Sequence, residues 1–257
     1  MEQKKILIID FDGVICDSIR ECFIVAYNAY LQNEGKNKGS RINFKAPRAL
    51  REYFFRNRHL VRPAREYFIL FKSFGRDGQK RLSSKQFKVW VKKCKDDSFV
   101  FEKNFYDTRR HLRSRYKKRW FRLNPIYPEA IKGIRELSRF FKIYISTTKD
   151  KKSVKMLLNE KILRLPENRL FTKESGLSKA ETARRICKNN KCKPVNAWFI
   201  DDNIAYLEEV SRMGVKCGLA HWGYSGEDAV RLARSRNYFI FKNFREVTKY
   251  LTRGEKK

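Results

Sequence analysis

Near its start the chain reads Ile6-Leu7-Ile8-Ile9-Asp10-Phe11-Asp12-Gly13-Val14, an apolar run followed by two aspartates and a glycine. A short continuous apolar run is typical of a strand in a sheet covered on both faces, and we expect a buried strand over residues 4–9. In an extended segment residues i and i+2 point to the same side, so Asp10 and Asp12 both project at the strand's carboxyl end. Gly13 then lets the chain turn away sharply.

The two carboxylates of Asp10 and Asp12 repel each other when held close and out of water, so their pairing favours a bound cation. Mg²⁺ takes oxygen ligands and commonly uses one or two carboxylates together with substrate phosphate oxygens. Open α/β sheets bind ligands in the crevice at the carboxyl ends of their strands. The alternative is an ordinary Asp-Gly turn with solvated acids, and segments later in the chain decide against it.

From about Pro125 onward the chain alternates short apolar runs with amphipathic stretches. Further strands are expected at residues 142–147, 169–171, 197–200, 216–220 and 238–241. Helices are expected at residues 128–140, 152–160, 179–189 and 203–213, with Gly214 as the C-terminal cap of the last. This alternation predicts an α/β fold with a doubly wound parallel sheet.

The segment from residue 19 to 124 differs, because it shows no clear strands and is rich in aromatic residues. It predicts an all-helical module inserted into a core formed by residues 1–18 and 125–257. One helical stripe is best explained as core packing and comprises Phe101, Phe105, Leu112, Tyr116 and Trp120.

Charge is the unusual feature of the composition. The chain has 60 Lys and Arg against 28 Asp and Glu, a formal net charge of +32. Residues 19–124 hold 29 of these cations against nine acids, which is a net charge of +20. Such a charge attracts nucleic acids, acidic metabolites or anionic surfaces whatever the fold, and a compositional bias of the lineage is the alternative.

Three later segments place polar residues at strand ends or helix starts. Ser146-Thr147-Thr148-Lys149 follows one predicted strand, and Asp201-Asp202 follows another, where adjacent acids suggest a metal site. Lys179 lies in the first turn of a predicted helix, where a cation opposes the helix dipole and indicates a nearby anion. Taken singly, Ser146–Thr148 could be a helix cap and Lys179 could be a solvated lysine. The order of all these motifs along the chain, each at a strand end or a helix start, makes coincidence a poor explanation.

Taken together, these motifs resemble those of the haloacid dehalogenase-like hydrolases, with Asp10–Val14 similar to the first motif, Thr147 to the second, Lys179 to the third and Asp201-Asp202 to the fourth. Ser146 is a one-residue alternative for the second motif. The helical insertion resembles the cap of the subgroup that contains phosphoglycolate phosphatase and β-phosphoglucomutase. The resemblance covers the whole chain and implies a phosphatase that works through an aspartyl-phosphate.

The resemblance also implies roles for single residues. Asp10 would be the nucleophile and Asp12 the acid and base, while Thr147 and Lys179 would hold phosphoryl oxygens. Mg²⁺ would be bound by Asp10, Asp202 and the backbone carbonyl of Asp12, with Asp201 as a further ligand or as an orienting group for metal-bound water. Residues expected to contact substrate are Gly13, Thr148, Arg62 and Arg65.

The expected substrate is a small phosphorylated and polyanionic metabolite or a nucleotide. The second aspartate, Asp12, favours phosphoryl transfer over dehalogenation, whereas mutase and phosphonatase activity stay open. A different class of function is a nucleic-acid-binding protein, or a phosphatase of nucleic-acid ends, on the same scaffold. The basic helical module motivates this alternative, while the complete set of catalytic motifs favours the small-molecule enzyme.

The six cysteines show no C-x-x-C pair and no adjacent His cluster, so reduced and mostly buried thiols are expected rather than zinc sites or disulfides. No run of residues approaches the roughly 20 apolar residues of a membrane-spanning helix. The apolar run at residues 6–9 is too short for the core of a signal peptide, and a cytoplasmic location is expected.

Overall fold

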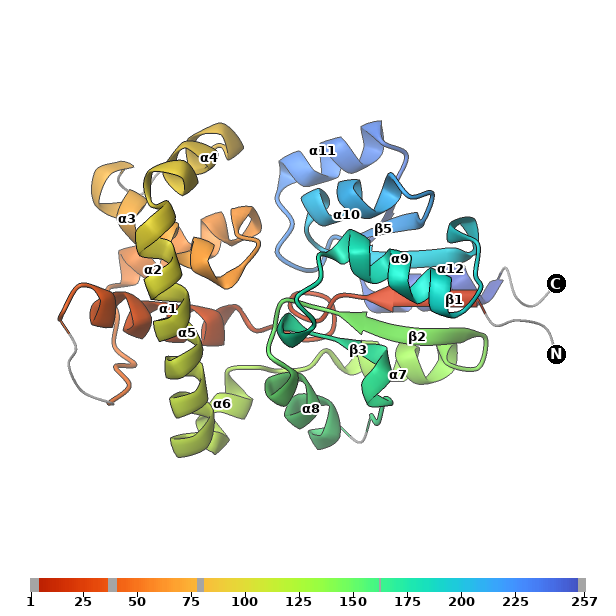
Figure 1. Cartoon of the computed structure of the whole chain (residues 1–257), viewed down its shortest axis with the longest axis horizontal. Helices are drawn as coiled ribbons and strands as arrows, with labels where there is room; N and C mark the ends of the chain where they lie inside the picture. Colours follow the sequence, from red (N-terminus) through yellow and green to blue (C-terminus); the bar gives the residue numbers. More distant parts are fainter. Residues whose placement is uncertain (1–4, 37–40, 78–80, 162, 254–257) are drawn as a thin grey trace. The chain divides into compact units, whose positions relative to one another are not determined.

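A computed structural model describes residues 5–36, 41–77, 81–161 and 163–253 (Figure 1). The chain forms two compact units. The first unit combines Met1–Asp17 with Pro125–Lys257, and the second unit is Ser18–Asn124. Lys4, the first residue of the first predicted strand, lies outside the described residues.

The first unit is built on a parallel sheet of six strands in the order β3-β2-β1-β4-β5-β6. The strands are β1 (Lys5–Ile9), β2 (Phe141–Ser146), β3 (Leu170–Phe171), β4 (Ala197–Asp201), β5 (Lys216–Ala220) and β6 (Phe239–Phe241). From β1 the chain first builds outward to β3 and then crosses to β4 on the other side of β1. The strand order therefore reverses between β1 and β4, where doubly wound sheets form their ligand crevice. The predicted fold class is confirmed.

Helices cover both faces of this sheet. They are α7 (Pro128–Leu137), α8 (Lys151–Glu160), α9 (Lys179–Asn189), α10 (Ile204–Ser211), α11 (Glu227–Ser235) and α12 (Phe244–Arg253), with 3₁₀ turns at Glu167–Arg169, Lys173–Ser175 and Pro194–Asn196. The helices α11 and α12 were not predicted. The helix α10 ends three residues before Gly214, which has a φ of +80° and donates its N–H to the carbonyl of Ser211 at 2.9 Å.

Side chains that alternate along the strands fill two apolar layers. Ile6 and Ile8 belong to a buried cluster that includes residues of α9, α10 and α11. On β4, Trp198 takes the other direction and contacts Tyr250 of α12, with ring centroids 5.7 Å apart. Because both faces are apolar and covered, the central strands are continuous apolar runs rather than alternating ones.

The second unit is helical. Its helices are α1 (Ile19–Asn33), α2 (Arg48–Asn57), α3 (Tyr67–Asp77), α4 (Ser84–Lys93), α5 (Lys95–Arg115) and α6 (Lys117–Arg122), with 3₁₀ turns at Arg58–Leu60 and Ala64–Glu66. The predicted aromatic stripe forms part of its core, since Phe101, Phe105, Leu112 and Trp120 are fully buried. Tyr116, at the edge of the stripe, is half-buried.

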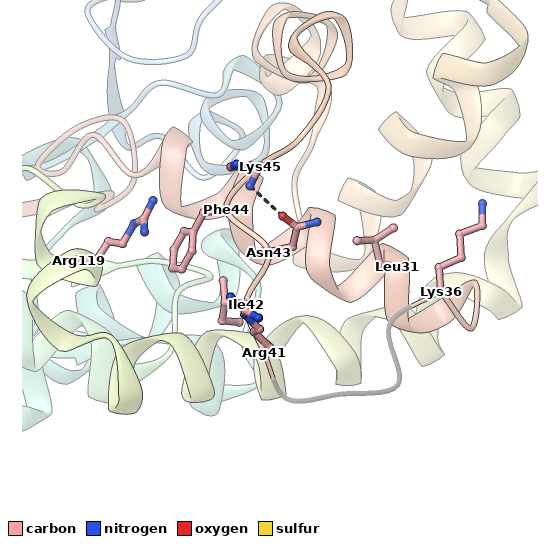
Figure 2. A pocket seen from close by; sticks show the side chains of 8 residues that line it. All are labelled: Leu31, Lys36, Arg41, Ile42, Asn43, Phe44, Lys45 and Arg119. Carbon is pink, nitrogen blue, oxygen red and sulfur yellow. Dashed lines mark hydrogen bonds between the residues drawn. The ribbon is translucent and has the colours of Figure 1, made fainter.

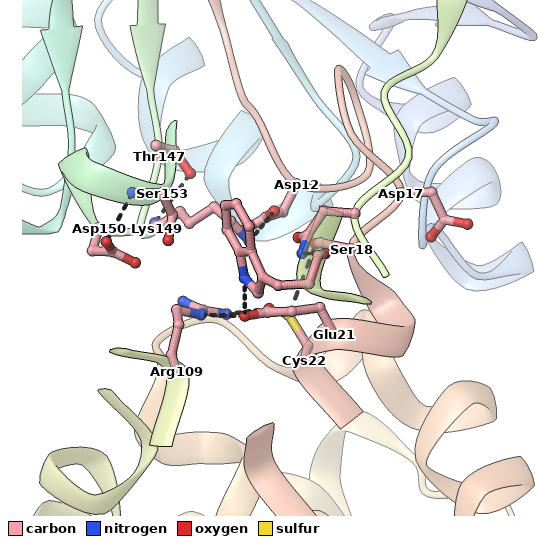
Figure 3. A network of polar contacts seen from close by, with 12 residues as sticks. Asp12, Asp17, Ser18, Glu21, Cys22, Arg109, Thr147, Lys149, Asp150 and Ser153 are labelled. Carbon is pink, nitrogen blue, oxygen red and sulfur yellow. Dashed lines mark hydrogen bonds and ion pairs between the residues drawn. The ribbon is translucent and has the colours of Figure 1, made fainter. Parts of the chain in front are cut away.

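A buried ion pair joins α1 to α5 in the second unit (Figure 3). Arg109 donates from Nε to Oε1 of Glu21 and from Nη2 to Oε2, both at 2.7 Å. The indole N–H of Trp120 donates to Oε1 of Glu21 at 3.3 Å, and Glu21 has no exposed surface. A buried carboxylate is tolerated when hydrogen-bond donors satisfy both of its oxygens in this way. The packing of α1 against α5 therefore depends on the pair of Glu21 and Arg109.

The cysteine thiols lie mostly in the interior of the protein. All six cysteines are free and five are buried. Burial raises the pKa of the Cys217 thiol to about 12, which keeps it protonated and unreactive. Among the described residues, no helix combines the length and apolarity that a membrane crossing requires.

We expect Glu21→Gln to lower the free energy of unfolding of the second unit by about 3–5 kcal/mol, because it leaves the buried Arg109 without its counterion. Arg110→Gln is the matched control, since Arg110 forms an exposed pair with Asp107 on the same helix, and it should cost less than about 1 kcal/mol. Urea denaturation followed by tryptophan fluorescence measures both. Equal losses in the two variants would contradict a structural role for the buried pair.

Candidate active site and metal centre

The register of the sheet brings three aspartates together. Ile9 of β1 pairs with Ile200 of β4, and the N–H of Asp10 donates to the carbonyl of Ile200 at 2.9 Å. The next residues on the two strands, Asp10 and Asp201, therefore emerge side by side at the carboxyl edge. One carboxylate oxygen each from Asp10, Asp201 and Asp202 lies within 4.8 Å of the others, and all three residues are buried.

Lys179 lies among these carboxylates. It is the first residue of α9, which Ser178 and Glu181 start with a reciprocal capping box. The Lys179 ammonium donates to Oδ1 of Asp10 at 2.5 Å and to the backbone carbonyl of Ser146, and it lies 3.4 Å from Oδ2 of Asp201. A lysine at a helix N-terminus is unfavourable by itself, so the buried anions explain its position.

Burial dominates the electrostatics of this cluster. Burial raises the pKa of Asp10, a rise that the Lys179 charge opposes and the Asp12 charge assists. Burial also raises the pKa of Asp201 well above its ordinary value, and the neighbouring charge of Asp10 adds to the rise. Burial alone would lower the pKa of Lys179, but the charges of Asp10 and Asp201 outweigh it and raise that pKa. The lysine is therefore a fixed cation within an excess of carboxylates.

Asp202 is held by two tight backbone approaches. Its Oδ2 accepts the N–H of Tyr224 at 2.7 Å. A Cβ on Gly13 would lie 2.2 Å from the same oxygen, and a Cβ on Gly223 would lie 2.6 Å from the Cβ of Asp202. Gly13 also has a φ of +87°, a conformation that favours glycine. The loops after β1 and β5 thus close around this carboxylate only because both positions lack a side chain.

Asp12 pairs with a second buried lysine (Figure 3). The Lys149 ammonium donates to Oδ1 of Asp12 at 3.1 Å, and Lys149 is only 1% exposed. In the sequence Lys149 follows the second predicted strand, but no role was predicted for it. The signal was its position three residues beyond a buried strand, although a lysine there is equally consistent with a solvated loop.

The residues present fit a magnesium ion. Oδ2 of Asp201 is buried without a hydrogen-bond donor, although the Lys179 ammonium lies nearby. Three clustered carboxylates carry more negative charge than the Lys179 ammonium among them neutralises, and carboxylate oxygens are the ligands that Mg²⁺ prefers. Asp10, Asp201 and Asp202 would hold the ion. The Asp12 side chain pairs with Lys149 instead, which agrees with a role for Asp12 in the site other than as a carboxylate ligand.

No protein-family model matches the sequence, and no curated protein matches it. Solved structures do. A predicted phosphoglycolate phosphatase from Haemophilus somnus superposes with a TM-score of 0.62 at 16% identity, over 98% of this chain and 99% of the other. A haloacid dehalogenase-like hydrolase from Streptococcus pneumoniae gives 0.55 at 18% identity, over 98% and 100%. A predicted phosphatase from Clostridium acetobutylicum gives 0.61 at 15% identity, over 98% and 100%. This chain has the haloacid dehalogenase-like fold.

Within this haloacid dehalogenase-like fold, the remaining predicted site residues divide into two groups. Thr147 is buried after β2, where its hydroxyl accepts the N–H of Lys149 at 3.2 Å, and Thr148 is exposed beside it. Arg62 and Arg65 belong to the second unit. There the Arg65 guanidinium lies 3.9 Å from Glu102, and the Arg62 N–H donates to Glu66 at 2.7 Å. Substrate binding by these two arginines stays a prediction.

We expect Gly13→Ala to destabilise the protein more than Gly176→Ala. Both glycines have positive φ, which costs an alanine roughly 1–2 kcal/mol, but a Cβ on Gly176 meets nothing within 4 Å. The added contact with Asp202 should cost about 1–3 kcal/mol more at position 13. Urea denaturation measures the difference. Added Mg²⁺ should raise the melting temperature of the wild type more than that of the Gly13 variant, because the alanine displaces the Asp202 carboxylate. Equal behaviour of the two variants would refute this arrangement.

Proposed function

We propose that this protein is a Mg²⁺-dependent phosphohydrolase that cleaves phosphate monoesters through an aspartyl-phosphate on Asp10. The single observation that carries the proposal is the buried cluster of Asp10, Asp201 and Asp202 around Lys179, at the point where the strand order reverses. Fixing three carboxylates out of water is costly, and a structural core gains nothing from it. The arrangement is explained when the cluster binds a metal and a phosphoryl group.

In the first step a carboxylate oxygen of Asp10 attacks phosphorus, so that a P–O bond to Asp10 forms and the P–O bond to the leaving alcohol breaks. Lys179 supports this step in two ways. It holds Oδ1 of Asp10, which orients the other oxygen, and its charge keeps the carboxylate ionised in a buried site. Lys179 also provides a fixed positive charge for a phosphoryl oxygen, and Thr147 is the proposed hydroxyl donor.

Asp12 is the proposed acid and base. In the first step it donates a proton to the departing oxygen, and in the second it removes a proton from the water that cleaves the bond between Asp10 and phosphorus. Lys149 holds Oδ1 of Asp12 at 3.1 Å and thereby fixes the direction in which the other oxygen points. Lys149 is accordingly a positioning residue for the acid and base.

Asp10 and Asp202 are the proposed ligands of Mg²⁺, with Asp201 as a third ligand or as an orienting group. When bound, the ion neutralises charge on the phosphoryl oxygens and on the attacking carboxylate. Asp202 needs no further positioning, because Tyr224 and the two glycines already fix its orientation.

The proposed substrate is a small phosphorylated metabolite or nucleotide. The structures that match this chain are named as phosphatases or hydrolases, which supports this class of reaction. In this proposal the second unit is a cap that contributes specificity, as segments over a rigid scaffold commonly do. A cytoplasmic location stays a prediction.

We expect Asp10→Asn to abolish phosphate release from a generic aryl phosphate, because an amide cannot form the acyl-phosphate. Asp12→Asn should lower kcat by about 10²–10⁴-fold. Removal of Mg²⁺ with a chelator should abolish turnover, and added Mg²⁺ should restore it. The matched control is Asp228→Asn, which changes an exposed aspartate that pairs with Arg231. Turnover that survives Asp10→Asn or the chelator would contradict the proposed mechanism.

Lys149→Met should lower kcat about 10- to 100-fold with a small change in KM, because it removes one charge-assisted hydrogen bond worth about 1.5–3 kcal/mol. Lys188→Met is the control, as Lys188 is exposed on α9. Steady-state kinetics and thermal melting should be measured on both variants. A loss of melting temperature with unchanged kcat would assign Lys149 a structural role only.

A further inference from the structure

The second unit contains a basic cavity of about 660 Å³, separate from the aspartate cluster of the first unit (Figure 2). Its lining residues are Leu31, Lys36, Arg41, Ile42, Asn43, Phe44, Lys45 and Arg119. Four of these eight carry a positive charge, and none of the described lining residues is acidic. A concave surface lined by charge of one sign concentrates ions of the opposite sign, so the cavity favours an anionic ligand.

The wall that carries Arg41 and Lys45 is held by a buried asparagine. Asn28 of α1 donates from Nδ2 to the carbonyl of Asn43 at 2.8 Å, and its Oδ1 accepts the N–H of Asn43 at 2.7 Å. Asn28 has no exposed surface. The side chain of Asn43 in turn accepts the N–H of Lys45 at 2.9 Å. The backbone between the two cations is therefore fixed by the fold and is not an arbitrary loop.

Aromatic rings lie within this basic surface. Phe44 is half-buried, and the guanidinium of Arg119 lies 3.4 Å from the centre of its ring. Tyr116 contacts Phe44 edge-on, with ring centroids 5.4 Å apart. Cations interleaved with flat rings and a stacked guanidinium are the features by which proteins bind unpaired nucleotides, since the cations contact phosphates and the flat groups stack on bases.

The cationic surface continues beyond the cavity. The end of α5 and the whole of α6, residues 109–122, contain eight Lys and Arg and no Asp or Glu. Arg109 is used in the buried pair with Glu21, but several others are exposed, namely Arg110, Arg115, Lys117, Lys118, Arg119 and Arg122. Arg119 belongs both to this segment and to the cavity wall, so the two surfaces are continuous. A single phosphate or a small metabolite has too few charges to use a surface of this extent.

We propose that the second unit binds single-stranded nucleic acid in this cavity, with Lys36, Arg41, Lys45 and Arg119 contacting the phosphate backbone and Phe44 and the Arg119 guanidinium supporting stacked bases. A single strand is favoured over a duplex because its base faces are accessible to side chains, whereas a duplex hides them in its own stack. The proposal does not depend on the phosphohydrolase activity.

The test is binding of a fluorescein-labelled oligothymidylate to the full-length protein, measured by fluorescence anisotropy over a range of salt concentrations. The cavity variant combines Lys36→Gln, Arg41→Gln, Lys45→Gln and Arg119→Gln. The control variant combines Lys85→Gln, Lys88→Gln, Lys92→Gln and Lys103→Gln, which are exposed lysines of α4 and α5 in the same unit. Both variants lose four charges, so the net charge of the protein stays matched.

At about 0.15 M salt each lost phosphate contact should weaken single-strand binding about fourfold, so the cavity variant should bind about 200-fold more weakly, with a salt slope lower by about 3. The control variant should bind within a few-fold of the wild type. A second variant combines Lys36→Glu and Lys45→Glu, which change only exposed side chains. It repeats the test if the cavity variant with four substitutions fails to fold. This double variant should bind the oligonucleotide more weakly than the matched control variant that combines Lys85→Glu and Lys88→Glu.

Three outcomes would overturn the proposal. Equal weakening in the cavity and control variants would assign the binding to net charge alone. A wild-type protein that does not bind the oligonucleotide at this salt concentration would exclude the site. A duplex of the same sequence that binds as tightly as the single strand would exclude the recognition of unpaired bases.

Discussion

The first unit depends on one electrostatic constraint, the burial of three carboxylates around the Lys179 ammonium group. Asp10, Asp201 and Asp202 cluster within 4.8 Å, and Lys179 bonds directly to only the first and approaches the second. Burial raises the pKa values of Asp10 and Asp201; the charge of Asp12 adds to the first rise and the charge of Asp10 adds to the second. The folded chain can hold this arrangement because a rigid parallel sheet fixes the backbone on both sides. The excess negative charge that remains suits a hard divalent cation.

The surrounding backbone and the cap of α9 position these groups. The β1–β4 register sets Asp10 beside Asp201, the capped start of α9 delivers Lys179, and two glycines let neighbouring loops approach Asp202. A single added Cβ at Gly13 would overlap with the Asp202 carboxylate, which makes the glycine a determinant of the geometry of this cluster.

In the second unit, chemically similar arginines serve two purposes. Arg109 is buried and saturated by Glu21, and it joins α1 to α5. Arg119, ten residues later, is exposed and stacks on Phe44 in the wall of a cavity with four cations. Four of the cations of this unit therefore line one concave surface. One arginine stabilises the fold, whereas the other belongs to a concave surface with the chemistry of a polyanion site.

The sequence by itself determined the α/β class, the strands and the candidate aspartates, because the burial of a parallel strand and a polar residue at its end are both local patterns. Local patterns did not predict α11 and α12, nor the partner of Asp12, because a short amphipathic stretch and a lysine after a strand each suit several environments. Only the tertiary structure decided that Lys149 pairs with Asp12 and that Arg109 is buried against Glu21. In each pair the two residues lie far apart along the chain. Strand register and helix packing, which act over these long separations, create such pairs, and no short stretch of sequence contains them.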